Sequence, residues 1–321
     1  MPKKKKNRSN TIYESSEVDD GYVIKRFESG DRYEGYYSNG KRNGKGTYIW
    51  SSGDKYVGDW TQGLFNGVGT LQLRTGDSFQ GSFLNGTMHG IGLKINARDG
   101  SVVEGMFCNG KAHGFCKKQH SNGDTKNGFF VNDVMNGYGE YKWNDGSMYC
   151  GNWNNDYMEG IGIKTFSQDA IKQQQGLTDI VTKYEGNFTK NLFNGLGSAL
   201  YSTGEKYSGN WKDSKRSGWG RLEFSDGLQY NGNFLNNRFH GRGCLEKEID
   251  ENLTDLQIDE NTIKVQLYIQ IYGGEYRGEF YYGKASGYGI LTLINGKQIK
   301  GIFKNDCIDI ENQTHPFYST Q

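Results

Sequence analysis

Hydrophobic and polar positions alternate with a period of two along most of this chain, in short runs separated by glycine-rich turns. The stretch YEGYYSNGKRNGKG, at residues 33–46, places aromatic residues and glycines at alternating positions. Residues two apart lie on the same face of a β-strand, so the alternation predicts strands with one face made of rings and glycines. Each such stretch holds two runs around a turn, which predicts a β-hairpin.

The same phrase returns along the chain, most often 23 residues later, as from Tyr33 to Tyr56 and from Tyr56 to Phe79. The full copies open at Tyr33, Tyr56, Phe79, Val103, Lys126, Tyr149, Tyr184, Tyr207, Tyr230 and Tyr276. A half copy precedes them at Gly21, and another follows at Ile299. A fixed period of this length is typical of arrays in which each unit packs only on its neighbours.

The columns of the repeat have a physical interpretation once the opening residue is numbered zero. Positions two and eleven are glycine in every unit, position four is always aromatic, and position thirteen is glycine except at Cys116. A glycine within a strand leaves room for the close approach of another group. We therefore predict a groove over these glycines that accepts an aromatic ring from a neighbouring strand or unit.

Position seven predicts the turn of each hairpin. It is glycine, asparagine or aspartate in nine units, and Ser214 is the exception. These three residue types tolerate a positive φ at low cost, as tight hairpin turns require.

Two units, YEGYYSNGKRNGKGTYIWSSGDK and YSGNWKDSKRSGWGRLEFSDGLQ, show why the array resembles MORN repeats (membrane occupation and recognition nexus). The resemblance covers most of residues 21–306. It implies an all-β protein, an elongated, twisted antiparallel sheet of stacked β-hairpins with a 23-residue period. The units that open at Val103 and Lys126 lack the leading aromatic residue, and their groove packing is expected to be the poorest.

The segments outside the repeat columns are assigned by composition. Residues 1–20 are predicted to be a basic and polar disordered tail, residues 21–306 the repeat array, and residues 307–321 a C-terminal tail. The insertion at 167–183 is polar and predicts a loop. The insertion at 245–275 begins with an acidic segment, 246–262, of unassigned role. It then alternates as IKVQLYIQIY, which predicts a strand. That insertion is interpreted either as a decayed repeat unit or as an acidic loop with a lengthened strand.

Charge and cysteine usage narrow the choice of partners. The net charge of the chain is +1. Five positive residues cluster near the N-terminus: Lys3, Lys4, Lys5, Lys6 and Arg8. The rest of the chain is therefore net negative. The cluster is interpreted as a contact for acidic lipid or an acidic partner, or as a solvated terminus. The rest of the chain has no basic stripe, so no nucleic-acid partner is expected. Five cysteines without a C-x-x-C pair, and an N-terminus without an apolar stretch, predict reduced thiols and a cytoplasmic location.

No catalytic, cofactor or metal site is predicted. His89, His113 and His240 all occupy position ten, and the first two belong to adjacent units. Residues one hairpin apart are separated by two strands, roughly 9–10 Å, whereas zinc holds its nitrogen ligands at about 2 Å. The histidines are therefore interpreted as polar turn residues. The Gly-x-Gly pairs lie within strands, unlike a nucleotide-binding loop, which enters a helix.

These observations favour a non-enzymatic scaffold that assembles proteins. By resemblance to stand-alone MORN proteins, a cytoskeletal or ciliary role similar to that of radial-spoke head proteins is expected. The alternative is a membrane-associated or phosphoinositide-associated tether, or a regulatory module like that of plant lipid kinases. A tether is expected to carry a basic face or a membrane anchor, and the sequence shows neither.

Position twelve supplies the candidate binding surface. It lies between two glycines, so its side chain faces away from them. It is apolar or aromatic in eight units: Val68, Ile91, Phe115, Tyr138, Ile161, Leu196, Trp219 and Tyr288. Its neighbours at position three are mostly polar. The row either contacts a protein partner or a second copy, centred on Tyr138, Ile161, Leu196 and Trp219, or is buried by curling of the sheet.

Overall fold

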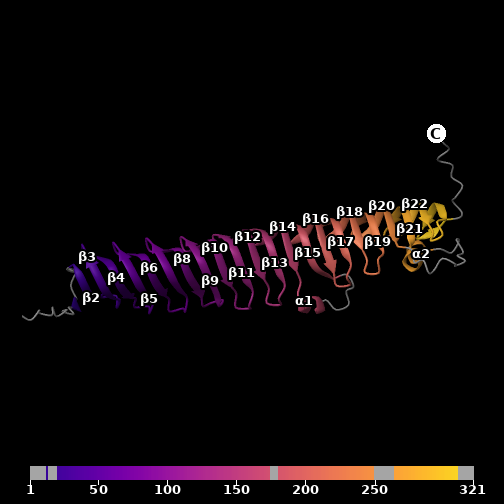
Figure 1. Cartoon of the computed structure of the whole chain (residues 1–321). Helices are drawn as coiled ribbons and strands as arrows, with labels where there is room; N and C mark the ends of the chain where they lie inside the picture. The colour runs from indigo at the N-terminus through magenta and orange to yellow at the C-terminus, as the bar shows by residue number, and fades with distance from the viewer. Residues whose placement is uncertain (1–11, 14–19, 174–179, 249–263, 310–321) are drawn as a thin grey trace, which may run out of the picture. The chain divides into compact units, whose positions relative to one another are not determined.

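A computed structural model describes residues 12–13, 20–173, 180–248 and 264–309. The chain divides into two compact units, Met1–Asn144 with Trp153–Asp156, and Asp145–Asn152 with Tyr157–Gln321. Within each unit, consecutive strands pair antiparallel as a meander of hairpins, which Figure 1 shows strand by strand. The predicted all-β antiparallel fold built from hairpins is confirmed.

The strands follow the repeat along the chain. Those of the first unit are β2 (Gly21–Arg26), β3 (Arg32–Ser38), β4 (Lys41–Ile49), β5 (Lys55–Thr61), β6 (Leu64–Gln72), β7 (Ser78–Leu84), β8 (Thr87–Asn96), β9 (Ser101–Cys108), β10 (Lys111–Gln119), β11 (Thr125–Val131) and β12 (Val134–Lys142). Residues of β13 (Met148–Asn154) belong to both units. Those of the second unit are β14 (Tyr157–Thr165), β15 (Val181–Thr189), β16 (Leu192–Tyr201), β17 (Lys206–Lys212), β18 (Lys215–Glu223), β19 (Gln229–Leu235), β20 (Arg238–Lys247), β21 (Gly274–Tyr281), β22 (Lys284–Thr292) and β23 (Gln298–Lys304).

The hairpin within each full repeat closes through two residues with positive φ. Position six has φ of 47–52° and position seven has φ of 60–93° in all ten full repeats. Two consecutive positive values define the type I′ turn, whose twist matches that of the flanking strands. Ser214, the exception to the predicted column, adopts the same conformation with φ of 60°.

The side chain at position seven also links neighbouring hairpins. Asn237 Oδ1 accepts a hydrogen bond from the Arg216 backbone N–H at 2.8 Å, and Ser214 Oγ accepts one from Phe193 N–H at 3.1 Å. Ser214 therefore replaces asparagine in its bonding as well as in its conformation. The prediction used only the tolerance of these residue types for positive φ. It did not include the hydrogen bond that the non-glycine side chains accept from the preceding hairpin.

Position eleven differs from the prediction that it lines the groove. Its glycines have φ of 66–103° in all ten full repeats. In β4 and β18 they lie in a β-bulge, where the register shifts by two residues. A Cβ at Gly114 would meet the Met106 side chain on the outer face of the sheet. This glycine column is needed for the bulge conformation, and not for ring packing.

The groove itself is formed by positions two and thirteen, and the ring that fills it comes from the same unit. A Cβ on Gly209 would lie 2.5 Å from Gly220 Cα and 2.6 Å from the Tyr207 hydroxyl oxygen. Tyr207 thus lies over the glycine two residues ahead in its own strand and over that glycine's cross-strand partner. For Gly220 the ring comes from the neighbouring strand, as expected, whereas for Gly209 it comes from the same strand.

Rings from adjacent units complete the core. All seven position-zero tyrosines are fully buried, and each donates its hydroxyl hydrogen to the position-three carbonyl at 2.8–3.3 Å. Tyr207 packs edge-on against Trp211 of its own unit and Phe234 of the next, with ring centroids 5.1 Å apart in both pairs. Edge-to-face pairs of this kind stabilise beyond their buried area.

The two repeats without a leading aromatic residue, those that open at Val103 and Lys126, fill the groove differently. Where Val103 replaces tyrosine, Cys116 replaces the glycine at position thirteen, is fully buried, and donates its thiol hydrogen to the Met106 carbonyl at 3.1 Å. Where Lys126 replaces tyrosine, the buried Met135 side chain lies over the glycine pair. The groove is filled in both units, so the expectation of poor packing there was wrong.

Val103 and Cys116 should therefore be energetically coupled. We expect Cys116→Gly to destabilise the fold by about 1–3 kcal/mol by leaving a void. Val103→Tyr should cost a similar amount, about 1–3 kcal/mol, because the ring would collide with the thiol. The double variant recreates the common tyrosine-over-glycine pair and should recover most of the loss. Chemical denaturation of all four proteins measures this, and simply additive costs would contradict it.

Both insertions leave the sheet pairing intact. β14 pairs directly with β15, and β20 pairs directly with β21, so the described residues of the two insertions add no further hairpin between these strands. The first insertion holds a short helix, α1 (Gln168–Lys172), with Ser167 Oγ accepting from Ala170 N–H at its start. The predicted loop, 167–183, was thus wrong at these five residues and at 181–183, which begin β15. In the second insertion, 245–275, the residues that belong to β20 and β21 pair with each other, so these residues do not form a decayed repeat.

The second insertion contains a helix where a strand was predicted. The alternating stretch forms α2 (Val265–Tyr272), of which Val265, Tyr268 and Ile269 are buried. These residues have the i, i+3, i+4 spacing of one helical face, a pattern that the same letters satisfy alongside strand alternation. The segment forms a helix because this helical face packs against β20, β21 and β22. Of the acidic segment 246–262, residues 249–262 lie outside the described part of the chain.

Two short strands fall in segments predicted to be tails. β1 (Ile12–Tyr13) pairs parallel with Ile24 and Lys25 of β2, and β24 (Cys307–Ile308) pairs with the end of β23. The sheet therefore includes a few residues beyond 21–306, and the predicted boundaries of the repeat array stay a prediction. Most other residues of both predicted tails lie outside the described ranges.

Candidate protein-binding surface

In the second unit the position-twelve row is exposed. Ile161, Leu196 and Trp219 lie on β14, β16 and β18, and between 58% and 68% of each residue's surface is accessible. Large apolar side chains exposed in register along one face mark interaction surfaces in soluble proteins. Curling of the sheet does not bury this row, which removes the alternative explanation for its apolar character within the unit.

Asparagines separate these apolar residues and satisfy their backbone. Asn187 Nδ2 donates to the Leu196 carbonyl and Asn210 Nδ2 donates to the Trp219 carbonyl, both at 3.0 Å. Asn187 pairs with Ile161 across the strands β14 and β15, and Asn210 pairs with Leu196 across β16 and β17. From strand to strand, apolar side chains of the row therefore alternate with asparagines. The amide groups of Asn187 and Asn210 are hydrogen-bonded to backbone carbonyls, so the surface contains both apolar and polar groups.

Trp219 borders a shallow depression on the same face. Its other lining residues include Asn231, Arg242, Glu246 and Arg277. Tryptophan and arginine are the residues most often found to dominate the energetics of protein interfaces. The surroundings of Trp219 therefore combine an exposed aromatic anchor with charged groups suited to orient a partner.

In the first unit the row has a different character. Val68, Ile91, Phe115 and Tyr138 are exposed at position twelve, and Met106 and Phe129 at position three are exposed as well. These two replace the polar residue found at position three in most units. Sequence reasoning missed them as surface candidates, although their departure from a polar column was a visible signal.

The remaining predicted site residues are placed as follows. Tyr138 belongs to the first unit, whereas Ile161, Leu196 and Trp219 belong to the second, so only the last three lie in one unit. Lys3, Lys4, Lys5, Lys6 and Arg8 lie outside the described residues, and their predicted contact with lipid or an acidic partner stays a prediction. Neither described helix is long and apolar enough to cross a membrane.

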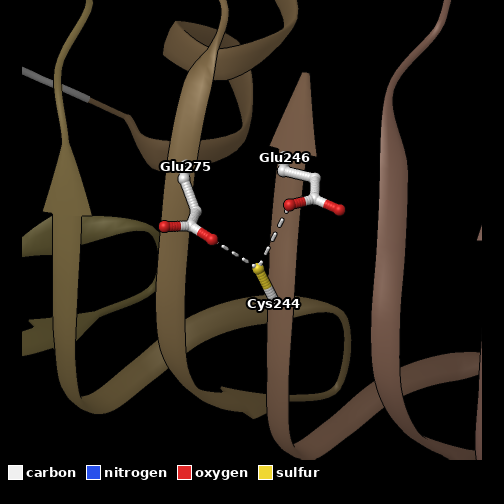
Figure 2. A group of neighbouring side chains, drawn as sticks. All are labelled: Cys244, Glu246 and Glu275. Atoms are coloured by element: carbon white, nitrogen blue, oxygen red, sulfur yellow. Dashed lines mark hydrogen bonds between the residues drawn. The ribbon is translucent and has the colours of Figure 1, made fainter. Parts of the chain in front are cut away.

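One cluster of possible metal ligands occurs among the described residues, and it contains no histidine. Figure 2 shows Cys244 and Glu246 on β20 and Glu275 on β21, with the thiol between the two carboxylates. Cys244 Sγ lies 3.2 Å from Glu275 Oε1 and 3.9 Å from Glu246 Oε2. None of the three residues was proposed as a ligand from the sequence.

The local charges of this cluster are already balanced in part. Arg277 Nε donates to Glu275 Oε1 at 2.5 Å, and Asn231 Nδ2 donates to Glu246 Oε1 at 3.3 Å. Burial, together with the hydrogen bond and charge of Glu275, raises the pKa of the Cys244 thiol to about 12. The protonated thiol is a weak nucleophile and a weak metal ligand. The arrangement is that of a hydrogen-bonded polar group on the sheet surface.

Comparison with solved structures finds distant likenesses. One is the TCP10 domain of Danio rerio CPAP in complex with a peptide of Danio rerio STIL, at 13% identity and a TM-score of 0.35, covering 88% of this chain and 100% of that one. Another is the SAS-4 (dCPAP) TCP domain of Drosophila melanogaster in complex with a proline-rich motif of Ana2 (dSTIL), at 10% identity and a TM-score of 0.22, covering 71% and 96%. Similarity this low carries no functional argument.

A search of curated proteins finds no match. The family model of the MORN repeat, in contrast, matches ten segments: 33–55, 56–78, 79–95, 104–125, 127–148, 149–169, 184–206, 207–229, 230–247 and 276–298. These segments coincide with the hairpins described above and span most of the chain. The two repeats without a leading aromatic residue, which open at Val103 and Lys126, are matched along with the others. This chain belongs to the MORN-repeat family.

Proposed function

We propose that this protein is a non-enzymatic scaffold that binds a protein partner along the position-twelve row of its second unit. The observation that carries the proposal is the exposure of Ile161, Leu196 and Trp219 in register on one sheet face. A repeat array places equivalent side chains at regular intervals, so an extended partner can contact several of them at once. Each contact adds to the others without any catalytic group.

The location of this activity is proposed from the family. We propose that the scaffold acts in the cytoplasm, as a component of the cytoskeleton or of the ciliary axoneme. The resemblance to stand-alone MORN proteins supports this assignment. The test is the localisation of a tagged protein in the source cell, followed by extraction with detergent. Retention with the insoluble cytoskeleton supports the proposal, and release with the membrane fraction favours the tether instead.

The double variant Leu196→Ser, Trp219→Ser tests the binding surface. Both side chains are exposed, so we expect the melting temperature to stay close to that of the wild type. Partners that co-purify with the wild type should be lost, because an interface tryptophan that acts as a hot spot contributes about 2 kcal/mol or more, and the loss of Leu196 removes adjacent apolar contact. Thermal melting and quantitative co-purification measure the two effects.

A matched control lies in the same hairpin. Leu192 is exposed but lies outside the row, so Leu192→Ser removes apolar surface and should leave the partners bound. Partner retention by the double variant would refute the proposed surface. A large fall in its melting temperature, with partners kept at low temperature, would show that the row stabilises the fold.

A further inference from the structure

The first unit carries an apolar surface that the proposed function does not use. We name it the apolar patch: Ile91, Met106, Phe115, Phe129 and Tyr138, on the consecutive strands β8 to β12. Ile91 pairs directly with Met106, and Phe115 pairs directly with Phe129. The rings of Phe115 and Phe129 lie 5.8 Å apart in an edge-to-face arrangement. The two pairs and Tyr138 therefore lie on five consecutive strands of the sheet.

Met106 and Phe129 occupy positions where other units use a residue that bonds the bulge. Asn187, Asn210 and Asn233 donate from this position to a carbonyl across the bulge, and Asp59 Oδ2 accepts from Val68 N–H. A methionine or phenylalanine side chain can make neither bond. These two residues replace a structural hydrogen bond with exposed apolar surface, a change that folding alone does not favour.

We propose that the apolar patch is the contact surface between two copies of this chain. The size of the surface fits such a contact. Its members are 49–72% exposed, and an apolar side chain of this size carries on the order of 200 Å², so the patch presents roughly 600 Å². Two copies would bury about 1,200 Å² together, the lower end of the range for specific interfaces.

The composition of the patch also favours a second copy over an unrelated partner. Interfaces between identical subunits are more apolar than those between independently soluble proteins. No asparagine interrupts the five residues, in contrast to the row of the second unit. The nearest charged pair along the strands is Glu104 opposite Lys117, of opposite sign, so a second copy meets no net like charge there. Two such sheet faces can stack with their side chains interdigitated.

The double variant Met106→Asn, Phe129→Asn is the sharpest test. It installs the residue that four other units carry at position three, so the fold should be retained. By sedimentation velocity across micromolar concentrations, the wild type should be a dimer and the variant a monomer, with at least a tenfold rise in the dissociation constant. Leu64→Ser is the matched control and should dimerise like the wild type, because Leu64 is an exposed apolar residue of the same unit that lies outside the patch.

A second variant covers the case in which the first does not fold. Phe115→Glu places one charge at the centre of the patch, on an exposed side chain, and should also give a monomer. A wild type that is monomeric at all these concentrations overturns the proposal, as does an unchanged dimer in both variants. A monomeric wild type whose patch variants lose a different co-purifying protein assigns the patch to that partner, and equally overturns self-association.

Discussion

Replacing Gly209 by valine is expected to destabilise the protein by about 3 kcal/mol or more, at the upper end of the cost of overpacked cores. A Cβ at this position would lie 2.5 Å from Gly220 Cα, which is backbone, and 2.6 Å from the Tyr207 hydroxyl oxygen. The ring could rotate away, but the backbone cannot without breaking the ladder between β17 and β18. Urea denaturation followed by tryptophan fluorescence measures the loss.

Gly110 is the matched control for that substitution. It has φ of 80°, and a Cβ there would meet only Met88 Cε, at 3.6 Å. Gly110→Val should therefore act through backbone conformation and cost about 1–2 kcal/mol. Equal costs at the two glycines, or a Gly209 variant as stable as the wild type, would contradict the steric account of the groove.

Truncation of Tyr184 to alanine is expected to cost about 3–5 kcal/mol, as for other fully buried aromatic residues. The ring is stacked on Phe193 at 3.8 Å and packs edge-on against Phe188 and Trp211. Its removal empties the groove and leaves faces of three other rings without a partner. Burial raises the pKa of the Tyr184 hydroxyl above its usual value, so the group remains a donor under alkaline conditions that would ionise an exposed tyrosine.

Tyr184→Phe separates the ring from its hydroxyl group. The hydroxyl donates to the Asn187 carbonyl at 2.9 Å, and the loss of this bond should cost about 1 kcal/mol. Phenylalanine already occupies the equivalent position at Phe79, so the backbone accommodates the change. Thermal melts of the two variants should therefore differ widely. A phenylalanine variant as unstable as the alanine variant would show that the hydrogen bond, and not ring packing, stabilises the unit.

The hairpins were predictable because their signals are local. Alternation of rings and glycines decides which face of a strand is buried, and the positive-φ residue at position seven closes the turn within four residues. Ten repetitions of the same columns made each local signal unambiguous. The exposure of position twelve followed partly from the same alternation, since a residue between two glycines must face away from them.

Several features depended on contacts that no single unit contains. The ring over each glycine pair, the bulge at position eleven and the bond from position seven to the preceding hairpin all involve cross-strand geometry. The exchange of tyrosine and glycine for Val103 and Cys116 is visible in the sequence as two separate exceptions. Only the structure shows that they are one substitution, because the thiol takes both the volume and the hydrogen bond of the missing tyrosine.

By itself, then, the sequence determined the repeat, its period, its hairpins and the side of each strand that is apolar. The tertiary structure decided what surrounds those strands. Residues 265–272 satisfy both strand and helix periodicity, and packing against β20 to β22 selected the helix. Likewise, Ile161, Leu196 and Trp219 would be core under a second layer and are surface without one. Burial depends on neighbours distant in the chain, and a pattern of residue types along one strand carries no record of them.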